Sequence, residues 1–239
     1  TLDFIIVVDG KNLQHYKIRN NSKEIKAMTT KIFKAFSATI DDTIFCMEHT
    51  GLYNLPLVKW LQSQQAKIWL ESGVHICKTL GLIRGKNDKV DSERIAMYAF
   101  TNQHQMKLWK APRKVIEKIA ALLSQRARFI KAKQQLYTAN KEQKQFLDKE
   151  IMKSLNKYTS KTLVVIDKQI EAIEKQILEL MKADEKLNRL FQIITSVKGI
   201  GFVTAAYMLV TTNEFISISN PKKYACYSGV VPFEHSSGS

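Results

Sequence analysis

Residues 107 to 192 contain no glycine and a single proline, Pro112, so the segment has only one of the residues that most often end a helix. Apolar residues recur there at helical spacing between charged ones, as in the run from 165 to 194. This pattern predicts a pair of long helices. A hydrophobic seam with a charged, solvated exterior is typical of an antiparallel coiled-coil arm.

The same segment carries most of the positive charge of the chain. The 239 residues include 37 Lys and Arg against 22 Asp and Glu, a net charge of +15. Residues 107 to 192 hold 20 of the former and 10 of the latter, with most of the excess between 107 and 161. The excess indicates an anionic partner, most commonly nucleic acid, although a solvated exterior explains it equally well. The candidate nucleic-acid contacts in the arm are Arg126, Arg128, Lys131 and Lys133.

The first hundred residues alternate strand-like and helix-like segments. An Asp9-Gly10 turn between residues 2 to 8 and 13 to 19 predicts a hairpin. Further on, periodicity predicts helices and strands in alternation, which is typical of an α/β layer structure. The expected helices are 23–38, 54–65 and 88–103, and the expected strands are 43–47 and 67–71.

After the arm, the string SVKGIGFVTAAYMLV predicts a helix, a Gly-Ile-Gly turn and a second apolar helix, as in a helix-hairpin-helix module. Glycine lets backbone N–H groups at a helix start approach a phosphate, so Lys198, Gly199 and Gly201 are candidate nucleic-acid contacts. Close helix packing is the alternative reason for these glycines.

Three acids are candidate metal ligands. Glu48 follows a buried strand, and reactive groups in open α/β sheets lie at the carboxyl ends of strands. Asp88 and Asp91 lie three residues apart, on one face of the expected helix. Carboxylates suit Mg²⁺ and phosphoryl transfer. The alternatives are that Glu48 is simply exposed at a strand end, that Asp88 caps the helix, and that the helix dipole favours Asp91 in the first turn. Ser236 and Ser237 are either a flexible tail or a source of a nucleophilic hydroxyl.

Other classes of protein are excluded. Cys46, Cys77 and Cys226 are far apart and lack metal-ligand spacing, so neither a zinc site nor a disulfide framework is expected. No run of eighteen apolar residues and no signal peptide occurs, so we expect an intracellular protein without a membrane partner.

Four strings together resemble the DEDD transposases, the family of the pilin-gene invertases and the bridge-RNA-guided insertion-sequence recombinases. They are MEHTGLY (47–53), GKNDKVDSERIA (85–96), SVKGIGFVTAAYMLV (196–210) and YSGVVPFEHSSGS (227–239). The resemblance implies a RuvC-like, ribonuclease H-like domain whose four acids bind Mg²⁺, a coiled-coil arm used in oligomer assembly, and a domain with a catalytic serine. By position, Glu48, Asp88 and Asp91 match the second, third and fourth acids, and Ser237 matches the nucleophile that forms a transient phosphoserine bond with DNA.

The resemblance sets the expected organisation. We expect a RuvC-like domain over 1–106, the arm over 107–192 and the beginning of a serine-containing, mainly helical domain over 193–239. Family members begin with a strand that carries the first acid, which we place upstream of Thr1, since Asp3 and Asp9 do not match it. They also continue past the serine.

The expected function is DNA transposition or site-specific inversion in a prokaryotic cytoplasm, at the nucleoid. The expected partners are DNA, a structured guide RNA and further copies of the chain. The alternatives are a RuvC-like nuclease that activates water and a non-catalytic, basic coiled-coil protein that binds nucleic acid.

Overall fold

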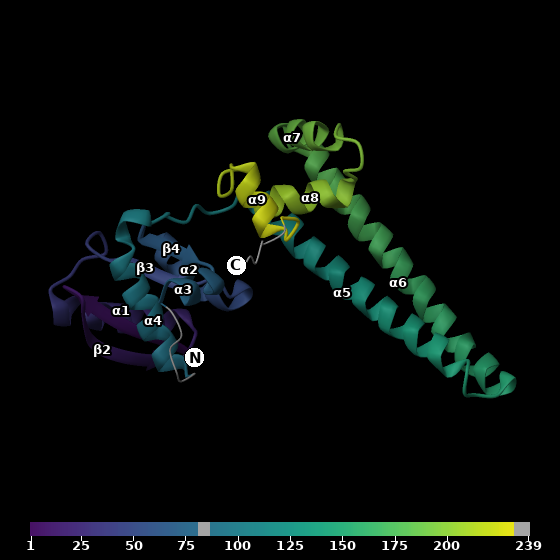
Figure 1. Ribbon diagram of the computed structural model, residues 1–239, viewed down its shortest axis with the longest axis horizontal. Coiled ribbons are helices and arrows are strands. Elements are labelled where there is room, and N and C mark those ends of the chain that lie inside the picture. The colour runs from purple at the N-terminus through teal and green to yellow at the C-terminus, as the bar shows by residue number, and fades with distance from the viewer. Residues whose placement is uncertain (81–86, 232–239) are drawn as a thin grey trace, which may run out of the picture. The chain divides into compact units, whose positions relative to one another are not determined.

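The computed structural model describes residues 1–80 and 87–231 and divides the chain into two units, Thr1–Trp109 and Lys110–Ser239 (Figure 1). Each unit has its own hydrophobic core. We describe the units separately. None of the described helices is both long enough and apolar enough to cross a membrane.

The first unit begins with the expected antiparallel hairpin, β1 (Leu2–Val8) and β2 (Lys11–Ile18). Asp9 and Gly10 both have positive φ angles, 50° and 77°, as a tight two-residue hairpin turn requires. A methyl group on Gly10 would lie 3.0 Å from the ring of Phe100 in α4 (Asp88–Thr101), which packs against β1. Both the turn and this close approach therefore favour glycine.

A parallel strand pair forms the second sheet of this unit. β3 (Ile44–Glu48) pairs in register with β4 (Lys67–Glu71), so Glu48 lies opposite Glu71. The connection between them runs through α2 (Leu55–Ser63), which packs with α1 (Ser22–Phe36). The core beneath these elements consists of Ile25, Met47, Leu57, Val58, Leu61 and Ile68. The alternation of strands and helices expected for an α/β layer structure is confirmed.

A short helix, α3 (Gly73–Leu80), follows β4 and was not predicted. Its eight residues span about two turns, too few for the apolar spacing to distinguish it from a loop. It packs against α4, and a second small core joins Trp69 of β4, Ile76 of α3 and Tyr98 of α4. This core fixes both helices at the carboxyl end of the parallel pair.

The second unit contains the two expected long helices, α5 (Lys114–Gln143) and α6 (Lys149–Ala183), which form an antiparallel hairpin (Figure 1). The second helix ends at Ala183, because Asp184 adopts an extended backbone and its side chain accepts the N–H of Leu187. A separate helix, α7 (Glu185–Thr195), begins there. After it come the expected α8 (Phe202–Thr211) and an unpredicted α9 (Pro221–Tyr227), whose N-terminus Asn220 caps.

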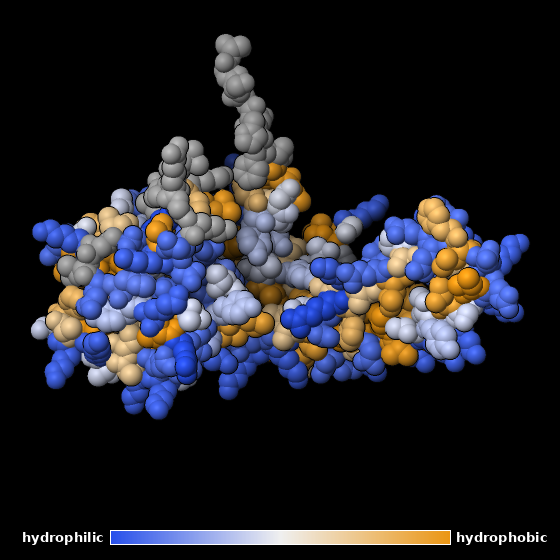
Figure 2. All heavy atoms as spheres, turned by 90° about the horizontal axis from the view of Figure 1, so that it is seen from below, coloured by the Kyte–Doolittle hydropathy of each residue, from blue (hydrophilic) through white to orange (hydrophobic). Residues whose placement is uncertain are grey.

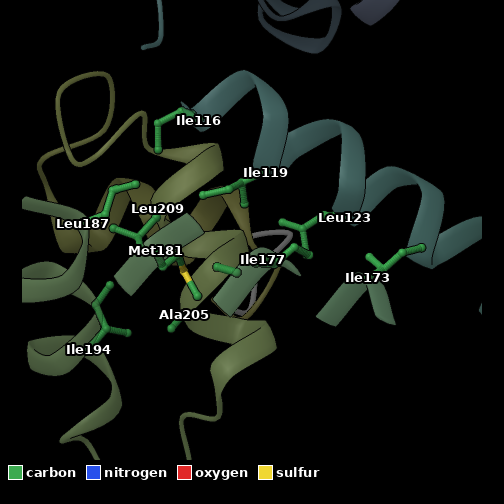
Figure 3. Packing of buried hydrophobic residues seen from close by; sticks show 11 residues of the cluster. Ile116, Ile119, Leu123, Ile173, Ile177, Met181, Leu187, Ile194, Ala205 and Leu209 are labelled. Carbon is green, nitrogen blue, oxygen red and sulfur yellow. The ribbon is translucent and has the colours of Figure 1, made fainter. Parts of the chain in front are cut away.

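The base of the arm shares one core with α7 and α8 (Figure 3). Ile119 and Leu123 of α5 face Ile177 and Met181 of α6, and Leu209 of α8 packs between them and α7. Towards the free end of the arm, Met152 and Ile166 are the buried apolar residues of α6. The arm is therefore anchored by packing at its base and held further out mainly by the contact between its two helices.

Arg113, the residue before α5, joins three distant segments of this unit. Its guanidinium donates to Glu214 at 2.7 and 2.8 Å and to Asp184 at 2.6 and 3.0 Å, and Lys186 lies 3.1 Å from Glu214. The side chain of Glu214 is 0% exposed. Burial alone raises the pKa of Glu214, but its hydrogen bonds with Arg113 and Lys186 outweigh burial and hold the pKa below its ordinary value.

The backbone around Glu214 is unusual. Asn213, Glu214 and Phe215 all have positive φ angles, 48°, 57° and 63°. Consecutive left-handed residues other than glycine are strained. Asn213 donates to the carbonyl of Lys110 at 3.2 Å, and Phe215 packs against the core of the unit. These contacts, together with the ion pairs of Glu214, hold the turn in this conformation.

Replacing Arg113 by Gln should lower the free energy of unfolding by about 3 kcal/mol, because a fully buried carboxylate loses its main partner. Urea denaturation followed by circular dichroism at 222 nm measures this change. Arg128→Gln is the matched control, since exposed Arg128 donates to Gln125 on its own helix at 3.3 Å and pairs with no acid among the described residues. Equal stabilities of the two variants would contradict the role given to Arg113.

Candidate functional site

Two carboxylates lie at the carboxyl end of the parallel strand pair. Glu48 ends β3 and Glu71 ends β4, and because the strands are in register the two side chains belong to the same face. Glu48 is exposed, and a methyl group on Gly73, at the start of α3, would overlap its Oε1. The glycine therefore leaves the space that the carboxylate of Glu48 occupies.

The loop after Glu48 is shaped by one amide side chain. Asn54 donates to the carbonyl of Glu48 at 2.9 Å and accepts from the backbone N–H and the hydroxyl of Thr50 at 2.6 and 2.7 Å. The N–H of His49 continues the ladder to the carbonyl of Glu71 at 2.9 Å. These bonds fix the backbone that presents Glu48, which accounts for Thr50 and Asn54 in the string MEHTGLYN.

Glu71 is the residue that sequence reasoning missed. Its carboxylate accepts from Trp69 Nε1 at 3.2 Å, from the Tyr98 hydroxyl at 3.1 Å and from the N–H of Ser72 at 2.9 Å. His75 Nδ1 lies 3.2 Å away. The available signal was that two neighbouring strand-like runs, IFCME and KIWLE, both end in glutamate. Glu71 thereby links β4 to α3 and α4, the helices that flank the candidate acids.

These contacts perturb the titration of the groups around Glu71. Burial raises the pKa of Glu71, but its hydrogen bonds with Ser72, His75 and Tyr98 outweigh burial and leave the pKa below its ordinary value. Burial, and then the charge of Glu71, raise the pKa of Tyr98 to about 12. The same two causes raise the pKa of Cys46 to about 12. Glu71 is therefore a carboxylate whose acceptor capacity is already used by the protein.

Asp88 and Asp91 occupy the first turn of α4. The cap of this helix is Asn87, whose side chain accepts the N–H of Val90 at 2.9 Å, so neither aspartate serves as the cap. Asp88 lies 3.4 Å from Lys17 Nζ, and Asp91 lies 2.9 Å from Arg94 Nη1. Both carboxylates remain largely accessible to solvent, with side-chain exposures of 71% and 43%.

The acids not assigned to the site have other surroundings. Asp3 is almost buried in the hairpin, where His15 and Lys17 lie 2.9 and 3.5 Å from its carboxylate. Asp9 is exposed in the turn between β1 and β2. Both residues have a structural reason to be where they are.

Carboxylates are the donors that Mg²⁺ prefers, so the chemistry of Glu48, Asp88 and Asp91 fits this ion. Their arrangement does not amount to a preformed site, since residues 1–80 and 87–231 include no group of three side chains that could hold a metal. Ser236 and Ser237 lie outside the described residues. The metal site and the nucleophile therefore stay predictions.

The four basic candidates of the arm have different surroundings. Arg126 pairs with Glu174 at 2.7 Å and Lys133 pairs with Asp167 at 2.5 Å, each across the two helices of the hairpin. Arg128 and Lys131 are exposed. Two of the four cations thus already contact acids of α6, whereas the other two face solvent.

The Gly-Ile-Gly turn connects α7 to α8. Gly199 has a φ angle of 93°, which L-residues other than glycine rarely adopt, and Lys198 beside it is exposed. Gly201 precedes α8, and no side chain caps this helix. Apart from the adjoining residues, no described atom lies within 4 Å of a Cβ built at either glycine. This geometry leaves room for a phosphate at the start of α8.

Comparison with known families gives two matches. A family model described as Transposase, DEDD_Tnp_IS110, matches residues 3–151. A second, described as Transposase IS116/IS110/IS902 family, matches residues 191–239. No curated protein matches the chain. Glu48, Asp88 and Asp91 fall within the first match, and Ser237 falls within the second.

The lowered pKa of Glu71 makes the first unit acid-sensitive. Its stabilisation is present above the ordinary carboxyl pKa of 4.5 and is lost as the pH falls through the lower pKa of the folded state. In Glu71→Gln, stability should therefore change less between about pH 6 and pH 3 than in the parent. Urea midpoints measured across this range test the prediction.

Tyr98→Phe is the companion variant, because it removes one donor to Glu71 and keeps the ring. We expect it to show a smaller reduction of the pH dependence and a loss of about 1 kcal/mol at neutral pH. Parallel curves for the parent and Glu71→Gln would show that the hydrogen bonds of Glu71 add no stability.

Proposed function

The chain belongs to the DEDD transposase family of insertion sequences, and on this premise we propose that it recombines DNA by magnesium-dependent phosphoryl transfer through a serine. Family membership implies a RuvC-like fold for the first match and an enzyme that acts on DNA. The observation that carries the proposal is the pair of matches, one containing the three acids and the other the Ser-Ser-Gly string.

In the proposed reaction, the hydroxyl of Ser237 attacks a phosphodiester of the DNA. A bond forms between its oxygen and phosphorus, the bond from phosphorus to one deoxyribose oxygen breaks, and that oxygen takes up a proton as it leaves. A strand hydroxyl then attacks the phosphoserine, which restores the serine and joins the strand to a new partner. No net hydrolysis occurs, so the number of phosphodiester bonds is conserved.

Glu48, Asp88 and Asp91 would hold Mg²⁺ together with phosphate oxygens of the DNA, which is how this ion is commonly bound at phosphoryl-transfer sites. The ion would neutralise charge at the reacting phosphate. The loop bonds of Asn54 hold the backbone of Glu48, and the bond from Tyr98 to Glu71 holds α4, which supports this role. The three acids do not form a metal site by themselves, so in this proposal phosphate oxygens of the DNA supply the remaining ligands.

The proposal extends to partners and products. We expect excision and insertion of an insertion sequence, or inversion of a DNA segment, by an assembly of several copies guided by a structured RNA. The open start of α8, with Lys198, Gly199 and Gly201, and the exposed Arg128 and Lys131 are the expected contacts with nucleic acid.

The decisive experiment seeks a covalent bond between protein and DNA. The protein is incubated with Mg²⁺, donor and target DNA and RNA transcribed from the flanks of the element, and denaturing gels resolve any adduct. We expect an adduct that is lost in Ser237→Ala and kept in Ser236→Ala, the matched neighbour. Cleavage without an adduct would indicate a nuclease that activates water, and the absence of both would leave a binding protein.

Gly73→Ala tests the placement of Glu48. The added methyl group forces the Glu48 carboxylate into another rotamer, so adduct formation should slow on the order of 100-fold. Because the displaced group is exposed, the urea midpoint should stay close to that of the parent. Ser72→Ala, at the exposed preceding residue, is the control and should retain the parent rate. An unchanged rate in Gly73→Ala would argue against a role for Glu48 in its present position.

A further inference from the structure

Four lysines follow one another along the first half of α6. Lys149, Lys153, Lys157 and Lys161 are spaced by four residues. On a helix with 100° and 1.5 Å per residue, each lies about 6 Å beyond and 40° around from the last. The four form a gently curving row on one face, which we name the lysine ridge.

The lysine ridge contributes nothing visible to the folding of the arm. All four residues are exposed, and within residues 1–80 and 87–231 none of them forms an ion pair. At 100° per residue, Lys157 and Lys161 lie on the side of the helix opposite Met152 and Ile166, the buried residues in the same part of the helix. Arg126 and Lys133, by contrast, are neutralised by acids across the hairpin. The ridge charges are therefore available to an external partner.

The surroundings of the ridge at the free end of the arm offset little of its positive charge. Between residues 149 and 165, Glu150 is the single acid in the sequence. An open hollow of about 410 Å³ lies at the turn between α5 and α6, lined by Lys144, Leu147, Lys149, Met152, Lys153 and Asn156. Figure 2 shows hydrophobic side chains among the hydrophilic ones at this end of the arm. Glu142 and Asp148 flank the turn, so the local excess comes mainly from the ridge.

The second half of α6 provides an internal comparison. Lys168, Lys175 and Lys182 are exposed on the same face of the helix. Glu171 and Glu179 lie between them at spacings of three and four residues, where opposite charges are neighbours on a helix. This half is therefore balanced, and within α6 the excess positive charge is confined to the ridge.

We propose that the lysine ridge binds the phosphate backbone of the DNA duplex on which the enzyme acts, without reading its sequence. A row of flexible, unpaired ammonium groups suits a polyanion, because each contact releases counterions condensed on the DNA. Pairing with the same ridge of a second copy would place like charges together, which is unfavourable. The inference rests on the proposed function for the identity of the ligand, but it concerns binding and not the chemical step.

The test compares two triple variants in the Ser237→Ala background, which keeps strand transfer from complicating binding. Lys153→Gln, Lys157→Gln and Lys161→Gln together remove three of the four charges of the ridge. Lys168→Gln, Lys175→Gln and Lys182→Gln remove the same number of charges from the balanced half of the same helix. Glutamine preserves helix propensity, and circular dichroism checks that the helical content is equal.

Fluorescence anisotropy with a duplex DNA of arbitrary sequence gives Kd at several salt concentrations. We expect the slope of log K against log salt to fall by about 3 in the ridge variant, roughly one per lysine, and by less than 1 in the matched control. The loss should be the same for DNA duplexes of different sequence. An RNA duplex of the same length is titrated in parallel.

Three outcomes would overturn the inference while leaving the proposed function intact: an unchanged slope in the ridge variant, equal losses in both triple variants, and a loss confined to RNA. If the parent binds no DNA under any condition, the inference and the proposed function both fail. A ridge variant that binds DNA as the parent does would therefore contradict the inference alone, whereas a parent that binds no DNA would contradict both.

Discussion

The helical unit depends on a carboxylate that it buries completely. Glu214 is neutralised by Arg113 and Lys186, and Arg113 also holds Asp184, so one guanidinium joins the start of α5, the junction of α6 and α7 and the turn after α8. An unpaired charge in that position would be costly, so these segments have to come together for the unit to fold. The shared core of Ile119, Ile177 and Leu209 then adds the apolar burial that anchors the arm at its base.

The first unit uses a carboxylate in a comparable way. Glu71 collects donors from β4 and α4 and lies beside His75 of α3, so the carboxyl end of the parallel pair is fixed on both sides. Glu48, directly opposite, makes no such set of bonds with the residues that the structure describes, and its exposed carboxylate lies beside Gly73. Two glutamates in equivalent strand positions thus differ in role. Glu71 stabilises the carboxyl end of the strand pair, and Glu48 is left accessible for the proposed chemistry.

The positive charge of the arm also divides into two kinds. Arg126 and Lys133 lie next to acids on the facing helix and stabilise the hairpin, whereas the ridge from Lys149 to Lys161 has no such partners in the described chain. A count of charges in the sequence treats both kinds alike. It identified Arg126 and Lys133 as candidate nucleic-acid contacts because they are basic, although their pairing makes them the less available members of the set.

Turn residues and apolar periodicity act locally, so the sequence predicted the hairpin, the strands 43–47 and 67–71, the long helices and the helix on each side of Gly199-Ile200-Gly201. It did not predict that the two strands pair in parallel. It did not determine α3 and α9, which are too short for periodicity, or the end of α6 at Asp184, which depends on a cap. The four strings in the sequence also indicated the family, since the order and spacing of motifs can be seen directly in the sequence. The pairing of the buried polar groups follows from the tertiary structure: Arg113 contacts Glu214 across 101 residues, and Tyr98 donates to Glu71 across 27. The physical reason is that an ion pair or a buried hydrogen bond depends on distance in space, which local sequence patterns do not encode.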